Sequence, residues 1–241
     1  MSGLAQNYGR IVKRELNAHA AWFPITNTLE VGDFGLIEDG TFRPVGKIGQ
    51  KYPDIQIKTQ PGNKSDIVFK SEGTTSVVLD MNGNATSFQA LGNADAQLKI
   101  SFSKENSVMI KTEITNIQMT NIGEVADALK KKKDWTRRYK VVSAVYEGKN
   151  ATILCSREAG TELTLSAKAD ILQAVEAGKA SAALTATSNK SGVFHSVGET
   201  GVVAIELFKL RLVGGGLNTL DVDPKEPIEP MPPTEVQDDI Y

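Results

Sequence analysis

The sequence predicts an α+β protein with a twisted, mostly antiparallel sheet and a few short helices. Several segments alternate apolar and polar residues, which is the pattern of strands with one buried face. Turn-forming Gly, Asn and Asp residues separate these segments. The chain of 241 residues is 40% hydrophobic but only 6% aromatic, and it holds 21 glycines. This composition favours a sheet with many turns, and the length is sufficient for a sizeable core.

An amphipathic helix is predicted near the N-terminus, over residues 3–18. Its apolar stripe consists of Leu4, Tyr8, Ile11, Val12 and Leu16. Arg10, Lys13 and Arg14 fall largely on the opposite side, which gives the helix a basic outer face. Two interpretations remain open: a surface helix docked on a sheet, or a basic helix that faces a membrane.

Short strands and tight turns are predicted next, and Asp39-Gly40 is the strongest hairpin signal in the chain. Residues 60–65, with the sequence QPGNKS, are expected to form a loop. Strands are expected around 66–70 and 74–81, followed by a turn at Asn82-Gly83.

The clearest alternation lies in residues 96–114, where it predicts a hairpin with one apolar and one polar face. Leu98, Ile100 and Phe102 come before a polar break at 104–107, and Val108, Ile110 and Ile114 come after it. A β-bulge is expected near residue 115, where the apolar residues change from even to odd positions. The apolar face is expected to cover a core in a soluble state, with lipid as its second possible partner.

A short helix is predicted from residue 122, because Asn121 and Glu124 have the spacing of a capping box. Its C-terminal end carries Lys130–Lys133, where positive charge favours the helix dipole. Beyond it, residues 139–156 are expected to form two strands with a turn at 147–150. Another alternating strand, with Leu163, Leu165, Ala167 and Ala169 on one face, and a last strand over 202–213 complete the body.

The chain is expected to divide at a glycine hinge, with an α+β body at 1–213 and an acidic, proline-rich tail at 214–241. Residues 221–241 hold seven acidic residues against one lysine, although the formal net charge of the whole chain is only −2. The tail is therefore suited either to shielding a cationic surface or to remaining solvated. A single cysteine, Cys155, excludes a disulfide framework, and a cytoplasmic location is predicted.

No catalytic, metal or cofactor site is predicted, so the chain is expected not to be an enzyme. His19 and His195 are expected at the surface, without a second ligand at metal-binding spacing, and Cys155 has no nearby histidine. A phosphate-binding loop is also missing from the sequence. The alternative left open is a catalytic constellation dispersed along the chain.

The basic run KKKKDWTRRYK, residues 130–140, allows three interpretations. The first is a solvated helix end. The second is nucleic-acid binding, which is disfavoured because no binding motif accompanies the run. The third is contact with an anionic lipid surface, where Trp135 and Tyr139 would act as interfacial anchors. The run alone does not decide between them.

The order of these elements resembles the pore-forming domain of gasdermins. The motifs that carry the resemblance are Phe23-Pro24 just after Trp22, a strand start at Tyr139–Val142, and the pattern G-x-x-x-A-I-E-L-x-K-L that begins at Gly201. Together they would extend the resemblance over about residues 5–213. Two features depart from the family pattern: the tail is expected to take the place of the large inhibitory domain of animal gasdermins, and the acylated N-terminal cysteine of some bacterial members has no counterpart in this sequence.

The resemblance implies a protein that stays soluble until a protease releases its tail, then binds acidic lipids, oligomerises and inserts two β-hairpins. The lipid contacts would be Arg10, Lys13, Arg14, Lys130, Lys131, Lys132, Lys133, Arg137 and Arg138. One hairpin would combine 66–81 with 96–119, and the second would use 139–156 and 160–186. The residues facing lipid would include Leu98, Ile100, Phe102, Val108, Ile110, Ile114, Leu163 and Leu165.

The resulting prediction is a cytoplasmic defence protein that permeabilises membranes as a homo-oligomer, without nucleic-acid partners. The alternative is a soluble β-rich binding or structural subunit of a phage or secretion apparatus, with a flexible acidic tail. The two differ in whether oligomerisation requires a membrane.

Overall fold

A computed structural model describes residues 3–22, 24–38, 40–136, 138–177, 184–210 and 217–219. The helices in these ranges are α1 (Gly3–Leu16), α2 (Ile48–Lys51), α3 (Phe88–Leu91), α4 (Ile122–Lys130) and α5 (Ala169–Glu176). The first strands are β1 (His19–Ala20), β2 (Asp33–Glu38), β3 (Thr41–Lys47), β4 (Thr59–Lys70), β5 (Thr74–Asp80) and β6 (Asp95–Phe102). The others are β7 (Ser107–Met119), β8 (Lys140–Ser156), β9 (Thr161–Lys168), β10 (Thr185–Ser188), β11 (Val193–Leu210) and β12 (Leu217–Thr219).

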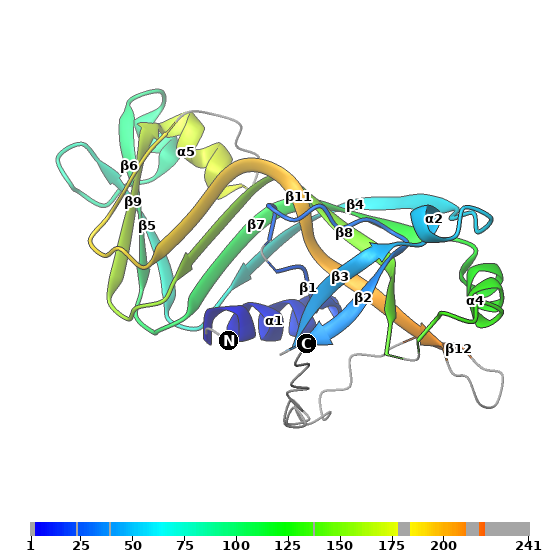
Figure 1. The fold of residues 1–241 in the computed structure, drawn as a ribbon. Coiled ribbons are helices and arrows are strands. Elements are labelled where there is room, and N and C mark those ends of the chain that lie inside the picture. The colour runs from blue at the N-terminus through cyan, green and yellow to red at the C-terminus, as the bar shows by residue number, and fades with distance from the viewer. Residues whose placement is uncertain are drawn as a thin grey trace, which may run out of the picture.

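These strands form two antiparallel sheets, which confirms the predicted α+β class. The large sheet contains eight strands, with β4, β7, β8 and β11 as its long members. The small sheet contains four strands in the order β10-β9-β6-β5. Figure 1 shows the small sheet with α5 at one end of the molecule, α2 and α4 at the other, and α1 alongside the long strands between them.

Helices α1 and α5 each cover the apolar face of several strands. Helix α1 forms as predicted and buries Leu4, Tyr8, Ile11 and Val12, which join a core cluster with apolar residues of β4, β7, β8 and β11. In β6, Ala96, Leu98, Ile100 and Phe102 are buried while the residues between them are partly exposed, so the predicted alternation is confirmed.

The predicted hairpin over 96–114 is wrong in its pairing, although both strands exist. β6 pairs with β5 and β9 in the small sheet, whereas β7 pairs with β4 and β8 in the large sheet. The two strands therefore follow one another along the chain instead of lying side by side. The polar residues 103–106 lead the chain from one sheet into the other.

Two predicted breaks are strands in the structure. Residues 60–65, expected as a loop, belong to β4, and the register shift between Pro61 and Lys64 accommodates the irregularity. Proline is tolerated there because β4 lies at the sheet edge. The turn expected at 147–150 is also wrong, because β8 runs unbroken from Lys140 to Ser156 between β7 and β11.

Other local predictions have mixed outcomes. The predicted hairpin is confirmed by the pairing of β2 with β3, with Gly40 at φ +72°, while Asp39 lies outside the described residues. Helix α4 is confirmed, but Asn121 makes no side-chain cap, because its amide bonds the backbone of Gln56 and Lys58 instead.

The irregularity of β7 against β8 lies between Lys111 and Glu113, a few residues before the expected position. The last strand begins at Val193, well before the predicted residue 202.

Candidate functional site

The most informative feature of the fold is a set of four chain segments that run through both sheets. We call them arm 1 (59–80), arm 2 (95–119), arm 3 (140–168) and arm 4 (185–210). Each arm contributes one strand to each sheet, and neighbouring arms pair in the same order, 1-2-3-4, in both. The small sheet therefore continues the long strands end to end (Figure 1). On every arm, one short segment connects the large-sheet strand to the small-sheet strand, and we call this segment the interruption of the arm.

The interruption between arms 2 and 3 preserves the register of the two strands. On the large-sheet side, Ser107 pairs with Ser156. On the small-sheet side, Phe102 pairs with Thr161. Residues 103–106 on one arm thus lie opposite residues 157–160 on the other, four on each side. Continuous strands could form here without any change of pairing, because no residue is in excess on either arm.

The eight predicted hairpin residues are buried, but beneath two different covers. Helix α1 packs on the cluster that contains Val108, Ile110 and Ile114. Helix α5 packs on a second cluster with the remaining five, Leu98, Ile100, Phe102, Leu163 and Leu165. On arm 2 all of them are even-numbered, so in a straightened arm they would occupy one face. The fold therefore keeps one potential apolar surface in two covered parts.

Helix α1 is also fastened to the interruption of arm 2. The side-chain amide of Asn7 donates to the carbonyl oxygen of Asn106 at 2.7 Å. At the middle of the helix, the buried Tyr8 hydroxyl donates to the carbonyl oxygen of Val203 at 2.8 Å. Desolvation by burial raises the pKa of Tyr8 well above its usual value. The helix therefore ties arms 2 and 4 together from the covered side.

A buried lysine lies beneath α5, in the corner between the two sheets. Lys111 of β7 is only 4% exposed, and its ammonium group lies 3.5 Å from the carboxylate of Glu176 at the end of α5. The hydroxyl of Ser76 on β5 donates to the same carboxylate at 3.5 Å. Desolvation lowers the pKa of Lys111, although the charge of Glu176 opposes that shift. The pair thus joins the large sheet, the small sheet and α5 at a cost in desolvation.

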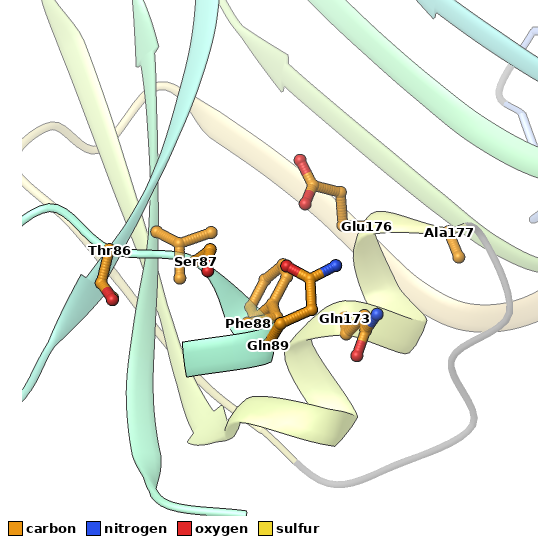
Figure 2. A pocket seen from close by; sticks show the side chains of 8 residues that line it. Thr86, Ser87, Phe88, Gln89, Gln173, Glu176 and Ala177 are labelled. Carbon is orange, nitrogen blue, oxygen red and sulfur yellow. The ribbon is translucent and has the colours of Figure 1, made fainter. Parts of the chain in front are cut away.

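A shallow groove of about 420 Å³ opens beside this corner. Figure 2 shows Phe88 and Gln89 of α3 near Gln173 of α5, with Glu176 at the side of the groove that is nearer the strands. The groove is open to solvent and is lined by residues of α3 and α5, with Val78 of β5 on the side of the small sheet. It marks α5 as a helix packed mainly through one face, with Leu172 and Val175 as its buried contacts.

The predicted lipid-contact residues form two separate groups. Arg10 and Arg14 are exposed on α1 and Lys13 is half-buried, while Arg14 contacts Glu15 at 2.5 Å. The second group follows α4, at the other end of the molecule (Figure 1). There Lys131, Lys133 and Arg138 are exposed. The structure therefore does not bring the two groups into one patch. Arg137 lies outside the described residues.

Within the second group, alternate lysines are held by carboxylates. The ammonium of Lys130 lies 2.9 Å from Asp127, and that of Lys132 lies 2.8 Å from Asp54. These contacts lower the pKa values of both aspartates. Lys131 and Lys133 remain the more accessible members of the run for an anionic surface.

Trp135 and Tyr139 belong to the packing of this end. Trp135 is 8% exposed and its ring centroid lies 5.3 Å from those of Phe34 and Tyr139. The ammonium of Lys51 lies 5.6 Å from the Phe34 ring centroid and forms an ion pair with Asp134 at 3.0 Å. In this state the tryptophan stabilises a core, so it is not available as an interfacial anchor.

Among the residues that the structure describes, Cys155 and the histidines are not placed in a catalytic arrangement. Cys155 is buried, and desolvation raises its pKa to about 12. His195 is exposed on β11, as expected, whereas His19 in β1 is half-buried. Within the described ranges there is no group of three or more His, Cys, Asp or Glu residues placed to hold a metal ion. None of the helices in those ranges has the length and apolar character needed to cross a membrane.

Helix α5 and the Lys111–Glu176 pair were not predicted from the sequence. Both depend on the corner between the sheets, which appears only when arms distant in sequence come together. The signal available in the sequence was the helical spacing of Leu172 and Val175 after the strand of Leu163 and Leu165.

The chain matches no protein-family model and no curated protein. Among solved structures it is similar to a bacterial gasdermin from Bradyrhizobium tropiciagri, with 14% sequence identity, a TM-score of 0.39 and coverage of 90% of both chains. It is also similar to gasdermin A3 in a membrane pore determined by cryo-EM, with 12% identity and a TM-score of 0.35. That alignment covers 91% of this chain and 96% of the other.

Proposed function

We propose that this chain is a gasdermin-like pore-forming protein that binds acidic membranes, oligomerises and inserts its arms as two β-hairpins. The observation that carries the proposal is the identical order of the four arms in both sheets, with an unchanged register across the interruption of arms 2 and 3. Arms 1 and 2 form the first hairpin. Arms 3 and 4 form the second, which replaces the predicted combination of 139–156 with 160–186.

The arms have the length that membrane insertion requires. A strand that crosses the hydrocarbon core needs about 9–11 residues of alternating pattern. β6 has 8 residues and β9 has 8, so neither suffices alone. Joined to β7 and β8 through their interruptions, they provide enough, with Leu98, Ile100, Phe102, Leu163 and Leu165 toward lipid. Their opposite face carries Lys99 and Glu162, which suits a water-filled pore.

Insertion has to be collective. β4 lies at one edge of the four-arm array and β11 at the other. A single subunit in hydrocarbon would leave the backbone groups of both edges unpaired, which is unfavourable. Pairing β4 of one subunit with β11 of the next removes both edges, so a ring of identical chains is the expected active form.

Basic residues recruit the subunit to the membrane in this mechanism. Each base near an anionic surface contributes about 1 kcal/mol. The exposed candidates are Arg10 and Arg14 on α1, with Lys131, Lys133 and Arg138 at the other end. Release of α1 from the arms then uncovers the apolar face of β7 and β8.

The tail is proposed to keep the protein inactive until a protease removes it. Its first described residues, Leu217–Thr219, form β12 and pair with β11 over Phe208–Leu210. They lie on the outer edge of β11, which a neighbouring subunit would need for assembly. The other residues of 214–241 lie outside the described part of the chain. On this proposal the protein is cytoplasmic before release and membrane-bound afterwards, in a defence role.

Dye release from liposomes of acidic phospholipid tests the proposal, comparing the full chain with a version that ends at Val213. Leakage from the truncated chain alone supports both the pore and the inhibitory tail. Leakage caused by both chains supports pore formation and shows that the tail does not inhibit it. If both folded proteins cause no leakage, the pore is excluded and the soluble binding or structural subunit becomes the better account. Liposomes of neutral lipid serve as the control for charge recognition.

A further inference from the structure

The outward face of β5, on arm 1, carries apolar residues that pack poorly in this fold. Val77 is 44% exposed and Met81, just after the strand, is 62% exposed. Leu79 lies between them on the same face and is half-buried. The inward face has Thr74 and Ser76 opposite the fully buried Phe102 and Ile100 of β6. The arm thus presents its more apolar side to solvent.

The interruption between arms 1 and 2 is unequal, unlike that between arms 2 and 3. The last large-sheet pair is Lys70 with Met109, and the first small-sheet pair is Thr74 with Phe102. Three residues of arm 1, 71–73, therefore lie opposite six residues of arm 2, 103–108. Side chains alternate between the two faces of a strand, so an odd difference exchanges the faces. Residues of β5 that share a face with the even-numbered residues of β6 are therefore even-numbered, whereas in β4 the odd-numbered residues share a face with the even-numbered residues of β7.

A continuous hairpin in hydrocarbon does not tolerate three surplus residues, because their backbone groups would lack partners. One strand has to slide. β6 is held by β9 in the register that already continues into β7 and β8, so it has no reason to move. β5 lies at the edge of the small sheet, paired with β6. Its backbone bonds to the following turn are local, within residues 78–86: Asp80 N–H to the Asn84 carbonyl, Gly83 N–H to the Asp80 carbonyl and Thr86 N–H to the Val78 carbonyl.

If β5 slides by three residues along β6, the register in which β4 pairs with β7 continues along the whole of arm 1. The N–H of Ser71 already donates to the carbonyl oxygen of Val108 at 2.8 Å, which is the first step of that continuation. Further along, Val77 would lie opposite Phe102, Leu79 opposite Ile100 and Met81 opposite Leu98. Asp80 would lie opposite Lys99, a favourable cross-strand pair. Val78 alone would move to the polar face.

We propose that β5 slides by three residues when the arms insert, and that Val77, Leu79 and Met81 thereby become contacts to lipid hydrocarbon. This inference rests on the proposed pore function and assigns lipid-facing residues that the alternation of arms 2 and 3 does not include.

Arm 4 provides an internal comparison. Between the pairs Val193–Ser156 and Ser188–Leu163, four residues of arm 4 lie opposite six of arm 3. That difference is even, so a slide there would leave every side chain on its present face. The change of face is thus specific to arm 1.

Engineered disulfides test the slide, because a bridge needs Cα atoms within about 7 Å. T75C/S101C joins residues that are paired now and locks the present register. D80C/K99C joins residues that are about 10 Å apart along the strands now but opposite each other after the slide. Q97C/S166C locks β6 to β9, whose register stays unchanged, and is the matched control. Cys155 does not interfere, because it is fully buried.

Each pair is introduced into the chain ending at Val213, and dye release is measured before and after reduction. We expect oxidised T75C/S101C to release dye from the liposomes at least about tenfold more slowly than its reduced form. Q97C/S166C should release dye at the same rate in both forms. We expect D80C/K99C to cross-link only with acidic liposomes. Unchanged leakage from oxidised T75C/S101C, blocked leakage from oxidised Q97C/S166C, or no liposome-dependent D80C/K99C bridge would overturn the slide. Absence of leakage from every reduced protein would instead overturn the pore function, and the slide with it.

Discussion

The two ends of the molecule are built differently. At the end with α2 and α4, Phe34, Tyr52, Trp135 and Tyr139 pack together, and Lys51 joins them through Asp134. At the end with α5, the small sheet is held by one short helix above a buried lysine and beside an open groove. The aromatic end is suited to remaining folded, and the α5 end is suited to opening. The difference indicates which part of the chain changes in the proposed mechanism.

Replacement of Trp135 by alanine should have the largest effect on stability. The side chain is 8% exposed and contacts three aromatic rings, so the loss is expected to be about 3–5 kcal/mol in the free energy of unfolding. Urea denaturation measures this, with the exposed Val45→Ala as a control that changes little. A loss below about 1 kcal/mol would mean that this end is not the rigid part.

Leu172→Ala should act on the opposite end and on function. Leu172 is fully buried in α5, and its truncation is expected to cost about 2–4 kcal/mol. Because the variant loosens the cover of Leu98 and Leu163, it should also speed dye release by the chain ending at Val213. Comparable acceleration by Trp135→Ala would remove the functional distinction between the two ends.

Charge reversal in the basic run separates accessible lysines from paired ones. Lys131→Glu with Lys133→Glu should lower liposome binding by more than about tenfold, at about 1 kcal/mol or more per site. Reversal of Lys130 and Lys132 is expected to have a smaller effect, since Asp127 and Asp54 already hold these ammonium groups. Co-sedimentation with acidic liposomes gives both values. Equal effects would show that the ion pairs do not influence membrane contact, and unchanged binding in both would remove this patch from the mechanism.

Lys111→Met together with Glu176→Gln is expected to give the smallest change, a stabilisation of about 1 kcal/mol, since both charges of a buried ion pair are replaced by uncharged side chains. The pKa of Lys111 is lowered in the folded state, so the unfolded chain binds its proton more tightly. The cost of burying the charge is therefore full below the folded pKa and decreases as pH rises toward 10.5. The difference between variant and wild type should shrink between pH 8 and 10.5 in thermal unfolding. A difference that grows with pH would contradict this account of the buried pair.

The sequence predicted the elements whose signal is local. The alternation of Leu98, Ile100 and Phe102 identified β6, and the spacing of Tyr8, Ile11 and Val12 identified α1. Which strand pairs with which was not predictable for β6 and β7, since the polar residues 103–106 suit a hairpin turn and a passage between sheets equally well. Register is a non-local property and depends on residues far apart in the sequence, such as the paired Asp95 and Lys168.

The candidate site could be predicted only as a list of residues. Basic positions such as Lys131 and apolar positions such as Leu163 follow from the sequence, but their covers do not. Asn121 shows the physical reason, because its amide is recruited by the backbone of residues 56 and 58, which no local pattern indicates. The same holds for Glu176, whose partner Lys111 comes from another sheet.

The central claim is that the small sheet joins the large one when the protein meets a membrane. Hydrogen exchange of the chain ending at Val213, with and without acidic liposomes, measures this at residues 103–106 and 157–160. In solution these residues connect the two sheets. The amides of Ser103, Arg157 and Gly160 already donate to backbone carbonyl groups there, so fast exchange is expected for residues 104–106 and Ala159. The account predicts strong protection of both segments on liposomes, together with retained protection of β6 and β9. Fast exchange of both segments on liposomes, while the membrane leaks, would contradict it.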